Sequence, residues 1–325
     1  MNVRRLIPAT ALAGAVALGA TALTACSGGA SADGANGGKL DVVASFYPLQ
    51  FLAQQIGGDH VKVTSLTKPG VEPHDLEITP RQTAQLDESD VVLYLKTLQP
   101  AVDKAVEQSG VSAKVDAAKL TTMEVHSADG HDHGSDEAGH AEEDHGHDHG
   151  EAGEDPHVWL DPVKYAEIAE GVGAAFAKAD PTHAAAYEKN AADLTGKLKA
   201  LDTEFKDGLK NSASKTFITT HSAFGYLAER YGLDQEGISG VDPESEPSPA
   251  RMKDLQALAK KEKVSTVFFE TLASPKTADT LARDLGLKTD VLDPLEGITD
   301  DSQGRDYFEV MRSNLKNLQK ALGAK

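Results

Sequence analysis

Residues 181–210, PTHAAAYEKNAADLTGKLKALDTEFKDGLK, form the stretch that decides how this chain is organised. After the opening proline, this stretch contains no further proline and only two glycines, Gly196 and Gly208. Its Ala and Leu residues recur at helical spacing. A helix of this length, rising about 1.5 Å per residue, spans roughly 40 Å. Because typical globular helices are shorter, we expect this one to join two lobes as a rigid strut.

Strand-like and helical segments alternate on both sides of this stretch. The apolar run VVLYL (residues 91–95) indicates a buried strand, and TFITT (residues 216–220) indicates another strand. Further strands are expected at residues 39–46, 61–67, 264–269 and 289–292. Helices are expected at residues 48–56, 98–109, 223–231, 249–261, 275–285 and 306–322, and after the caps Thr79 and Asp161. The alternation predicts an α/β fold with mainly parallel sheets, in lobes at residues 39–180 and 211–325.

Charge and composition narrow the classes of partner. The 325-residue chain has 51 acidic and 32 basic residues, a formal net charge of −19. It therefore has no surplus of Lys and Arg to neutralise phosphates, which argues against nucleic acid as a partner. The acidity suits a cationic solute, although it also serves solubility alone. With 40% hydrophobic residues the chain can bury two cores. We also expect it to act as a monomer.

Residues 1–26, MNVRRLIPATALAGAVALGATALTAC, have the pattern of a secretory signal peptide. A membrane-anchor helix is the alternative, but the uncharged run is only weakly apolar. The ending LTAC resembles the lipobox of bacterial lipoproteins, in which the cysteine is acylated, and Cys26 is the only cysteine of the chain. Residues 27–38 are expected to be a flexible tether. The expected location is therefore the extracytoplasmic face of the bacterial membrane, with a lipid anchor on Cys26.

Four residues occur where parallel α/β sheets gather their ligands, beyond the carboxyl ends of strands or just before a capped helix. They are His74, His157, His221 and Asp293. A histidine of this kind on its own is more often a structural residue than a ligand. Two from each lobe at the same edge of their sheets indicate a shared site. Three imidazoles and a carboxylate suit Zn(II) better than Mn(II), which is expected to have more carboxylate ligands.

Five segments together resemble the zinc-binding branch of the metal-specific solute-binding proteins of ABC transporters. They are ASFYPLQFLAQQIGGD, PGVEPHDLEITP, DPHVWLDP, THSAFGYLAERYGL and VFFETLASPKTADTLARDLGLKTDVLDPL. The resemblance covers essentially all of residues 39–325. It implies two (β/α) lobes joined by one long rigid helix, with the metal in the cleft between them. It also implies delivery of the metal to a membrane permease powered by a cytoplasmic ATPase.

The same resemblance implies a ligand set. His74, His157 and His221 match the zinc ligands of the family. The fourth position varies within the family, and Asp293 matches the carboxylate that some members use. Glu72 is a competing candidate or a water-mediated neighbour. Manganese-binding relatives have Glu where this chain has His221, which favours zinc over the manganese alternative. The chain also lacks the extra Cys pair of some relatives.

A histidine-rich tract covers residues 124–155, with twelve acidic residues, seven histidines and no Lys or Arg. Such a composition cannot bury enough apolar surface to fold alone, so we expect a solvated loop. Its histidines are His126, His131, His133, His140, His145, His147 and His149. Zinc-specific members of the family carry such a loop, and we interpret it as a low-affinity zinc collector or sensor. An expression tag is the alternative, but tags are usually terminal and uninterrupted.

The leading hypothesis is capture of extracytoplasmic Zn(II) and its delivery to an ABC permease. A secreted zinc hydrolase is a second possibility, because a catalytic zinc keeps one position open for water. Whether Asp293 binds the metal then distinguishes the two hypotheses, since a zinc held by three histidines and a water would be a catalytic site. The chain has no HExxH helix and no Ser or Cys nucleophile motif, so we expect no enzyme activity. A surface zinc reservoir or adhesin is compatible with a lipid anchor, as an additional role.

Overall fold

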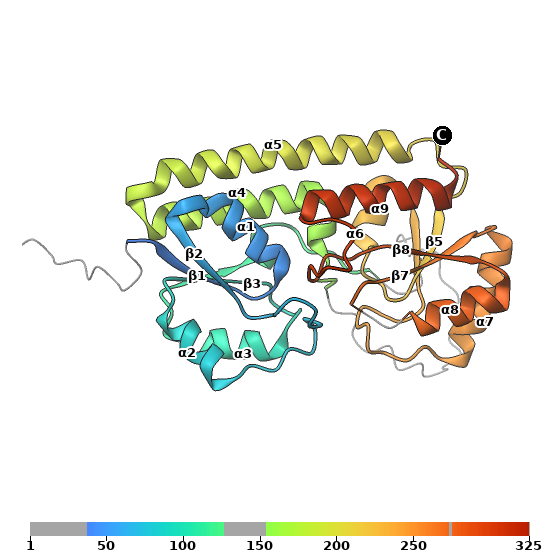
Figure 1. Cartoon of the computed structure of the whole chain (residues 1–325), viewed down its shortest axis with the longest axis horizontal. Coiled ribbons are helices and arrows are strands. Elements are labelled where there is room, and N and C mark those ends of the chain that lie inside the picture. The colour runs from blue at the N-terminus through green and yellow to red at the C-terminus, as the bar shows by residue number, and fades with distance from the viewer. Residues whose placement is uncertain (1–37, 127–153, 273–274, 325) are drawn as a thin grey trace, which may run out of the picture.

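The computed structural model describes residues 38–126, 154–272 and 275–324. In Figure 1, two four-stranded sheets lie side by side, and the long helix α5 (Ala184–Leu209) runs above both of them. Each strand pairing within the two sheets is parallel. The expected fold class, two α/β lobes with parallel sheets joined by one long helix, is confirmed.

The N-terminal lobe is a three-layer sandwich built on a sheet with strand order β2-β1-β3-β4. Its strands are β1 (Leu40–Ala44), β2 (Val61–Ser65), β3 (Val91–Tyr94) and β4 (Ala113–Asp116). Its helices are α1 (Tyr47–Gly57), α2 (Pro80–Glu88), α3 (Pro100–Gln108) and α4 (Pro162–Ala179). In Figure 1, α1 and α4 cover the face of the sheet nearer α5, and α2 and α3 cover the other face.

The C-terminal lobe repeats this strand order, as β6-β5-β7-β8. Its strands are β5 (Thr216–Thr219), β6 (Asp234–Gly237), β7 (Thr266–Phe269) and β8 (Lys288–Val291). Its helices are α6 (Gly225–Tyr231), α7 (Pro249–Lys261), α8 (Lys276–Leu285) and α9 (Tyr307–Leu322). Short 3-10 turns are η1 (Gly58–His60), η2 (Ala117–Lys119), η3 (Val158–Leu160) and η4 (Pro181–His183). The edge strands β4 and β6 were not predicted, because AKVD and DQEG lack the apolar run of a buried strand.

Side-chain caps explain where two of the predicted helices begin. The Thr79 hydroxyl accepts a hydrogen bond from the Gln82 backbone N–H and forms a capping box at the start of α2. Asp161 accepts hydrogen bonds from the N–H groups of Val163 and Lys164 at the start of α4. The same Asp161 carboxylate lies 2.6 Å from Arg230 Nη2 on α6, so the cap also ties the two lobes together.

One face of α5 is buried along its whole length and holds the two lobes in a common core. Residues at helical spacing on this face are buried, among them Leu194, Leu198 and Phe205. The apolar cluster around them extends from β1 in one lobe through α4 and α5 to α9 in the other. The expected helix at residues 181–210 begins as the turn η4 and is α-helical from Ala184. Because the lobes share this core, α5 sets their relative position.

Among the described residues, no helix is both long and apolar enough to cross a membrane. The expected signal peptide, with Cys26 at its end, lies outside the described part of the chain. The same holds for the expected tether up to residue 37.

Candidate metal centre

Four side chains from four separate loops meet between the lobes, and we call them the buried group. The members are His74, His157, His221 and Glu296. His74 follows β2, and His157 comes late in the connection from β4 to α4. His221 lies two residues after β5, and Glu296 lies in the loop after β8. All four loops follow the carboxyl ends of parallel strands, where α/β sheets gather ligands. The structure therefore brings the three predicted histidines together and adds Glu296.

The spacing of the ligand atoms fits a tetrahedral ion. Glu296 Oε1 lies 3.3 Å from His74 Nε2, 3.2 Å from His157 Nε2 and 3.4 Å from His221 Nε2. The Nε2 atoms of His157 and His221 are 3.3 Å apart. A tetrahedral zinc with bonds of about 2.0–2.1 Å holds its ligand atoms about 3.3–3.4 Å apart. These four separations match the edge lengths that such an ion requires, and all ligand atoms of the group lie within 4.8 Å of one another.

Buried carboxylates orient two of the imidazoles. His157 Nδ1 lies 2.7 Å from Asp155 Oδ1, and His221 Nδ1 lies 2.6 Å from Glu270 Oε1. In the neutral ring, each carboxylate accepts a hydrogen bond from Nδ1–H, which leaves the Nε2 lone pair available to a metal at the centre of the group. Glu270 also accepts a hydrogen bond from the Thr220 hydroxyl. A carboxylate behind the outer ring nitrogen is the usual arrangement for histidines that bind a metal.

Burial differs among the four members of the buried group. The side chains of His157, His221 and Glu296 are fully buried, whereas that of His74 is 10% exposed. Glu296 Oε2 is buried and has no hydrogen-bond partner among the described residues. A buried carboxylate oxygen without a partner is costly, and a bound cation would remove that cost. His74 lies on the side from which an ion can enter.

The pKa values in the buried group reflect close opposite charges in a dry site. Burial alone lowers the pKa of His157 and His221, but the carboxylates of Asp155 and Glu270 raise both above their usual range. Burial alone raises the pKa of Glu296, but hydrogen bonds from the surrounding imidazoles hold it well below its usual range. The carboxylate of Glu296 is therefore ionised and able to ligate a cation.

Asp293, expected as the fourth ligand, lies outside the buried group. Its Oδ1 accepts a hydrogen bond from the Leu295 N–H at 2.8 Å, and its Oδ2 accepts one from Thr271 Oγ1 at 3.0 Å. Leu295 has a φ of 60°, a left-handed conformation that is rare outside glycine. Asp293 stabilises this turn and so positions Glu296. Burial, partly offset by the two hydrogen bonds, raises the pKa of Asp293 to about 6.

The sequence analysis missed Glu296, which stands three residues after Asp293 in LDPLE. Asp293 directly follows a predicted strand, whereas the left-handed turn that brings Glu296 forward cannot be read from residue types. The only signal in the sequence is a second carboxylate within the same loop.

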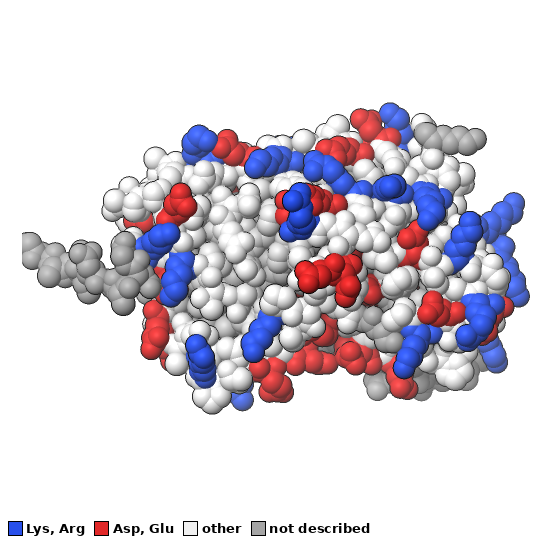
Figure 2. Space-filling view, viewed as in Figure 1, with Lys and Arg blue, Asp and Glu red and all other residues white. Residues whose placement is uncertain are grey.

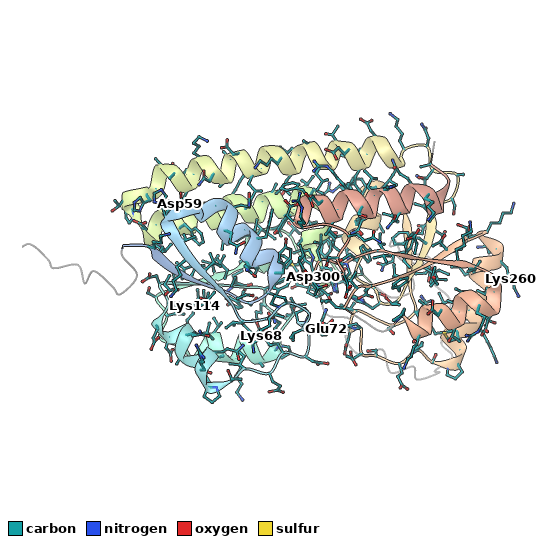
Figure 3. The ribbon with its side chains drawn as sticks, in the orientation of Figure 1. Asp59, Lys68, Glu72, Lys114, Lys260 and Asp300 are labelled. Carbon is teal, nitrogen blue, oxygen red and sulfur yellow. The ribbon has the colours of Figure 1, made fainter. Side chains whose placement is uncertain are left out.

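Glu72, the competing candidate, lies beside the buried group and outside its four ligand atoms. In Figure 3 it lies between the two lobes. Its Oε1 accepts a hydrogen bond from the His74 backbone N–H at 3.0 Å. Burial and the charge of Glu296 raise the pKa of Glu72 to about 8. Glu72 therefore holds the His74 loop in place through this hydrogen bond.

A clamp of aromatic side chains fixes the two halves of the centre relative to each other. Trp159 Nε1 donates to the Pro294 carbonyl across the lobes at 2.7 Å. The Tyr307 hydroxyl donates to the Trp159 carbonyl, also at 2.7 Å. Trp159 follows His157 by two residues and Pro294 precedes Glu296 by two, so these bonds set the distance between two ligands from opposite lobes.

The two ends of the histidine-rich tract are folded, unlike the solvated loop that we expected for residues 124–155. Asp155 is fully buried, and its backbone N–H donates to the Glu124 carbonyl at 2.8 Å. His126 Nδ1 lies 2.8 Å from Asp155 Oδ2. The histidines expected as loop sites at positions 131–149 lie outside the described residues. Only His126 of the seven therefore has described contacts.

Surface charge favours the approach of a cation. Figure 2 shows acidic side chains gathered where the two lobes meet, below α9, and basic side chains along the helices above them. With a formal net charge of −19, the protein has a negative surface potential overall. A metal cation is therefore attracted to the protein at long range.

The chain matches, over residues 42–321, the protein family described as zinc-uptake complex component A, periplasmic. It is 40% identical over 310 residues to the high-affinity zinc uptake system protein ZnuA of Bacillus subtilis, with 92% of this chain and 94% of that protein covered. It is 38% identical over 306 residues to the zinc-binding lipoprotein AdcA of Streptococcus pneumoniae. That match covers 91% of this chain and 58% of AdcA, so the chain spans little more than half of this relative.

A solved structure has the same fold. The Zn(II)-bound ZnuA-like domain of Streptococcus pneumoniae AdcA superposes with a TM-score of 0.70 at 33% sequence identity. The superposition covers 88% of this chain and 99% of that domain. The likeness extends over both lobes and the helix that joins them.

Proposed function

Because this chain belongs to the family of periplasmic zinc-uptake complex components, we propose that it captures Zn(II) outside the cytoplasm and delivers it to an ABC-type permease. The observation that carries the proposal is the buried group, whose four ligand atoms have tetrahedral spacing. Two of the ligands come from each lobe, so the ion completes a contact between the lobes.

The ligand set favours zinc over manganese and carriage over catalysis. Three imidazoles and one carboxylate match the nitrogen-rich coordination that Zn(II) accepts, whereas Mn(II) prefers more oxygen ligands. A catalytic zinc keeps one position open for water, but four protein ligands fill a tetrahedral shell. The relatives are named for zinc binding and zinc uptake, in agreement with a carrier.

Release of the ion begins at His74. It is the only ligand of the buried group whose side chain reaches solvent, with 10% of it exposed, and its loop connects β2 and α2 outside the shared core. The other three ligands are buried and held by the clamp and by their carboxylate partners. Docking of a permease against the His74 loop would therefore open the coordination shell at the least constrained ligand.

The protein is anchored to the extracytoplasmic face of the membrane by a lipid on Cys26 and acts as a monomer. The lipobox-like LTAC supports the anchor, and a relative is named a lipoprotein. Its partners are the permease and the ATPase that powers it. A Cys26→Ser variant should lose lipid labelling in intact cells, and undiminished labelling would contradict the anchor.

The histidines at positions 131–149 act as a low-affinity collector that raises the zinc concentration near the buried group. Their spacing supplies many nitrogen ligands beside acidic side chains. Replacing these six histidines with Gln should abolish the weakly bound zinc ions and leave the tight site unchanged. If the original protein and this variant bind the same number of zinc ions, these residues bind no zinc.

Transport is tested in cells that lack their own zinc-uptake system. Expression of the intact chain together with its permease and ATPase should restore uptake of radioactive zinc and growth under zinc limitation. The Glu296→Gln variant, expressed and anchored to the same level, should restore neither. Recovery of uptake by the Glu296→Gln variant would contradict the proposal, and binding of zinc without any uptake would favour a reservoir.

A further inference from the structure

A second set of potential metal ligands lies beside the buried group, and we call it the surface group. It consists of Glu124, His126 and Glu229. His126 Nε2 lies 3.0 Å from Glu229 Oε2 and 3.7 Å from Glu124 Oε2. We propose that the surface group is a second binding site for Zn(II) or a similar divalent transition-metal ion. The proposal rests on these contacts and not on transport.

The spacing of the three ligand atoms suits one ion. Ligand atoms around a tetrahedral zinc lie about 3.3–3.4 Å apart, and the two distances from His126 Nε2 bracket this value. All three atoms are within 4.8 Å of one another. Three protein ligands leave the fourth position to water.

An independent observation is the carboxylate behind His126. Its Nδ1 lies 2.8 Å from Asp155 Oδ2, so a buried carboxylate holds the outer ring nitrogen while Nε2 faces the two glutamates. This is the same arrangement that orients His157 and His221 in the buried group. The His126 ring also packs edge-on against Tyr226, with centroids 4.6 Å apart. The imidazole is thus preset for a ligand at Nε2.

Asp155 serves both groups at once. Its Oδ2 faces His126 Nδ1, and its Oδ1 faces His157 Nδ1 at 2.7 Å. The His157 backbone N–H and the Tyr226 hydroxyl, which bonds to the Asp155 carbonyl, hold Asp155 from two more sides. Because the carboxylate is fixed by the buried group, the position of His126 is fixed as well.

The charge around the surface group favours a dication. Three carboxylates, those of Glu124, Asp155 and Glu229, lie around His126, opposed by one cation. Lys164 Nζ lies 2.6 Å from Glu124 Oε1 and leaves Oε2 directed at His126. The net charge of about −2 around a neutral imidazole is balanced by one divalent ion. Since the Glu229 side chain is 63% exposed, the site exchanges ions more readily than the buried group.

The experiment removes one surface ligand in a background that lacks the six histidines at positions 131–149. We would replace His131, His133, His140, His145, His147 and His149 with Gln in the full-length chain and titrate it with Zn(II) by calorimetry. Two binding events are expected, one tight and one weaker. Adding Glu229→Gln should weaken the second event at least about tenfold, as loss of a ligand does. The exposed side chain of Glu229 makes misfolding of this variant improbable on structural grounds.

Two matched variants assign the events. Glu188→Gln, which changes an exposed glutamate on α5, should keep both events. Glu296→Gln should weaken the tight event and keep the weaker one. A single event in the background that lacks these six histidines would overturn the proposal, because His126 would then be only an imidazolium paired with carboxylates. A weaker event that Glu229→Gln leaves unchanged would overturn it equally.

Discussion

The buried group and the surface group are built from the same types of ligand, histidine and glutamate, but differ in their exposure to solvent. Each places a histidine against the Asp155 carboxylate, and each draws ligands from both lobes. The buried group has four ligand atoms in a closed shell, whereas the surface group has three and includes the exposed Glu229. We therefore expect the two sites to differ in affinity through the completeness of the shell and the exclusion of water, and not through ligand type alone.

The difference has a consequence for how the protein works. A closed shell between two rigidly joined lobes holds an ion until a partner moves a ligand. An open shell at the surface exchanges its ion with the solvent. The buried group is suited to carrying zinc and the surface group to transient binding, and each of the following variants tests part of this contrast.

The largest effect is expected at Glu296. Replacing it with Gln keeps the shape but removes the charge that faces three imidazoles, so zinc affinity should fall at least about 100-fold, about 2.7 kcal/mol. The matched variant Asp293→Asn should change affinity less than about tenfold, because Asp293 only supports the turn. Competition titration with a zinc chelator measures both. A larger loss in Asp293→Asn than in Glu296→Gln would reverse the assignment of the fourth ligand.

The histidines of the buried group should differ among themselves. His157→Ala and His221→Ala remove fully buried ligands, and each should lower zinc affinity by roughly 10- to 100-fold. His74→Ala should cost less, about tenfold, because water can reach the vacated position at the exposed rim. The same competition titration with a zinc chelator ranks the three variants by their loss of zinc affinity. Three equal losses would show that exposure does not distinguish His74.

Asp155 links the two groups, so its replacement should affect both. Asp155→Asn weakens the orientation of His126 and His157, and zinc affinity should fall about tenfold at each site. Asp180→Asn is the control, since Asp180 makes the same contact to His183 Nδ1, at 2.6 Å, away from either group. Calorimetry on the two variants separates coupling from general damage. An Asp155→Asn variant with only one weakened site would mean that the carboxylate serves one group alone.

The last prediction concerns pH. Lowering the pH should weaken zinc binding, whereas it should stabilise the metal-free protein. The raised pKa values of His157 and His221 mean that the metal-free site holds protons above pH 6.5. Zinc displaces these protons, so its affinity should fall by about tenfold or less per pH unit for each proton displaced as the pH drops. Thermal unfolding with and without zinc at pH 6, 7 and 8 measures both trends.

The metal-free protein should respond in the opposite direction. Because the folded pKa values lie above the unfolded ones, the stabilisation from these histidines is complete below about pH 6.5. It is lost as the pH rises through the raised values. Parallel pH dependence with and without zinc would contradict this account of the buried group.

The sequence predicts most of the architecture, because hydrophobic periodicity and helix caps depend on residues that are close together in the chain. VVLYL and TFITT identify two of the strands, and Thr79 and Asp161 form the helix caps expected of them. The edge strand β4 (AKVD) and the edge strand β6 (DQEG) carry no such pattern. Their pairing depends on a neighbouring strand that only the folded chain supplies.

The candidate site was predictable in part for the same reason. His74, His157 and His221 follow strands or precede a capped helix, so their positions can be inferred from element boundaries. Glu296 depends on the left-handed Leu295 and on Asp293, and tertiary contacts decide both. The folded ends of the histidine-rich tract likewise depend on contacts with α6 that composition does not reveal.

The most direct test of the central claim is a crystal structure of the zinc-loaded protein with anomalous data collected at the zinc edge. The account predicts that the strongest peak lies about 2.0–2.2 Å from the Nε2 atoms of His74, His157 and His221 and from an oxygen of Glu296. A strongest peak ligated by Asp293 or Glu72 in place of Glu296, or located away from these histidines, would contradict it.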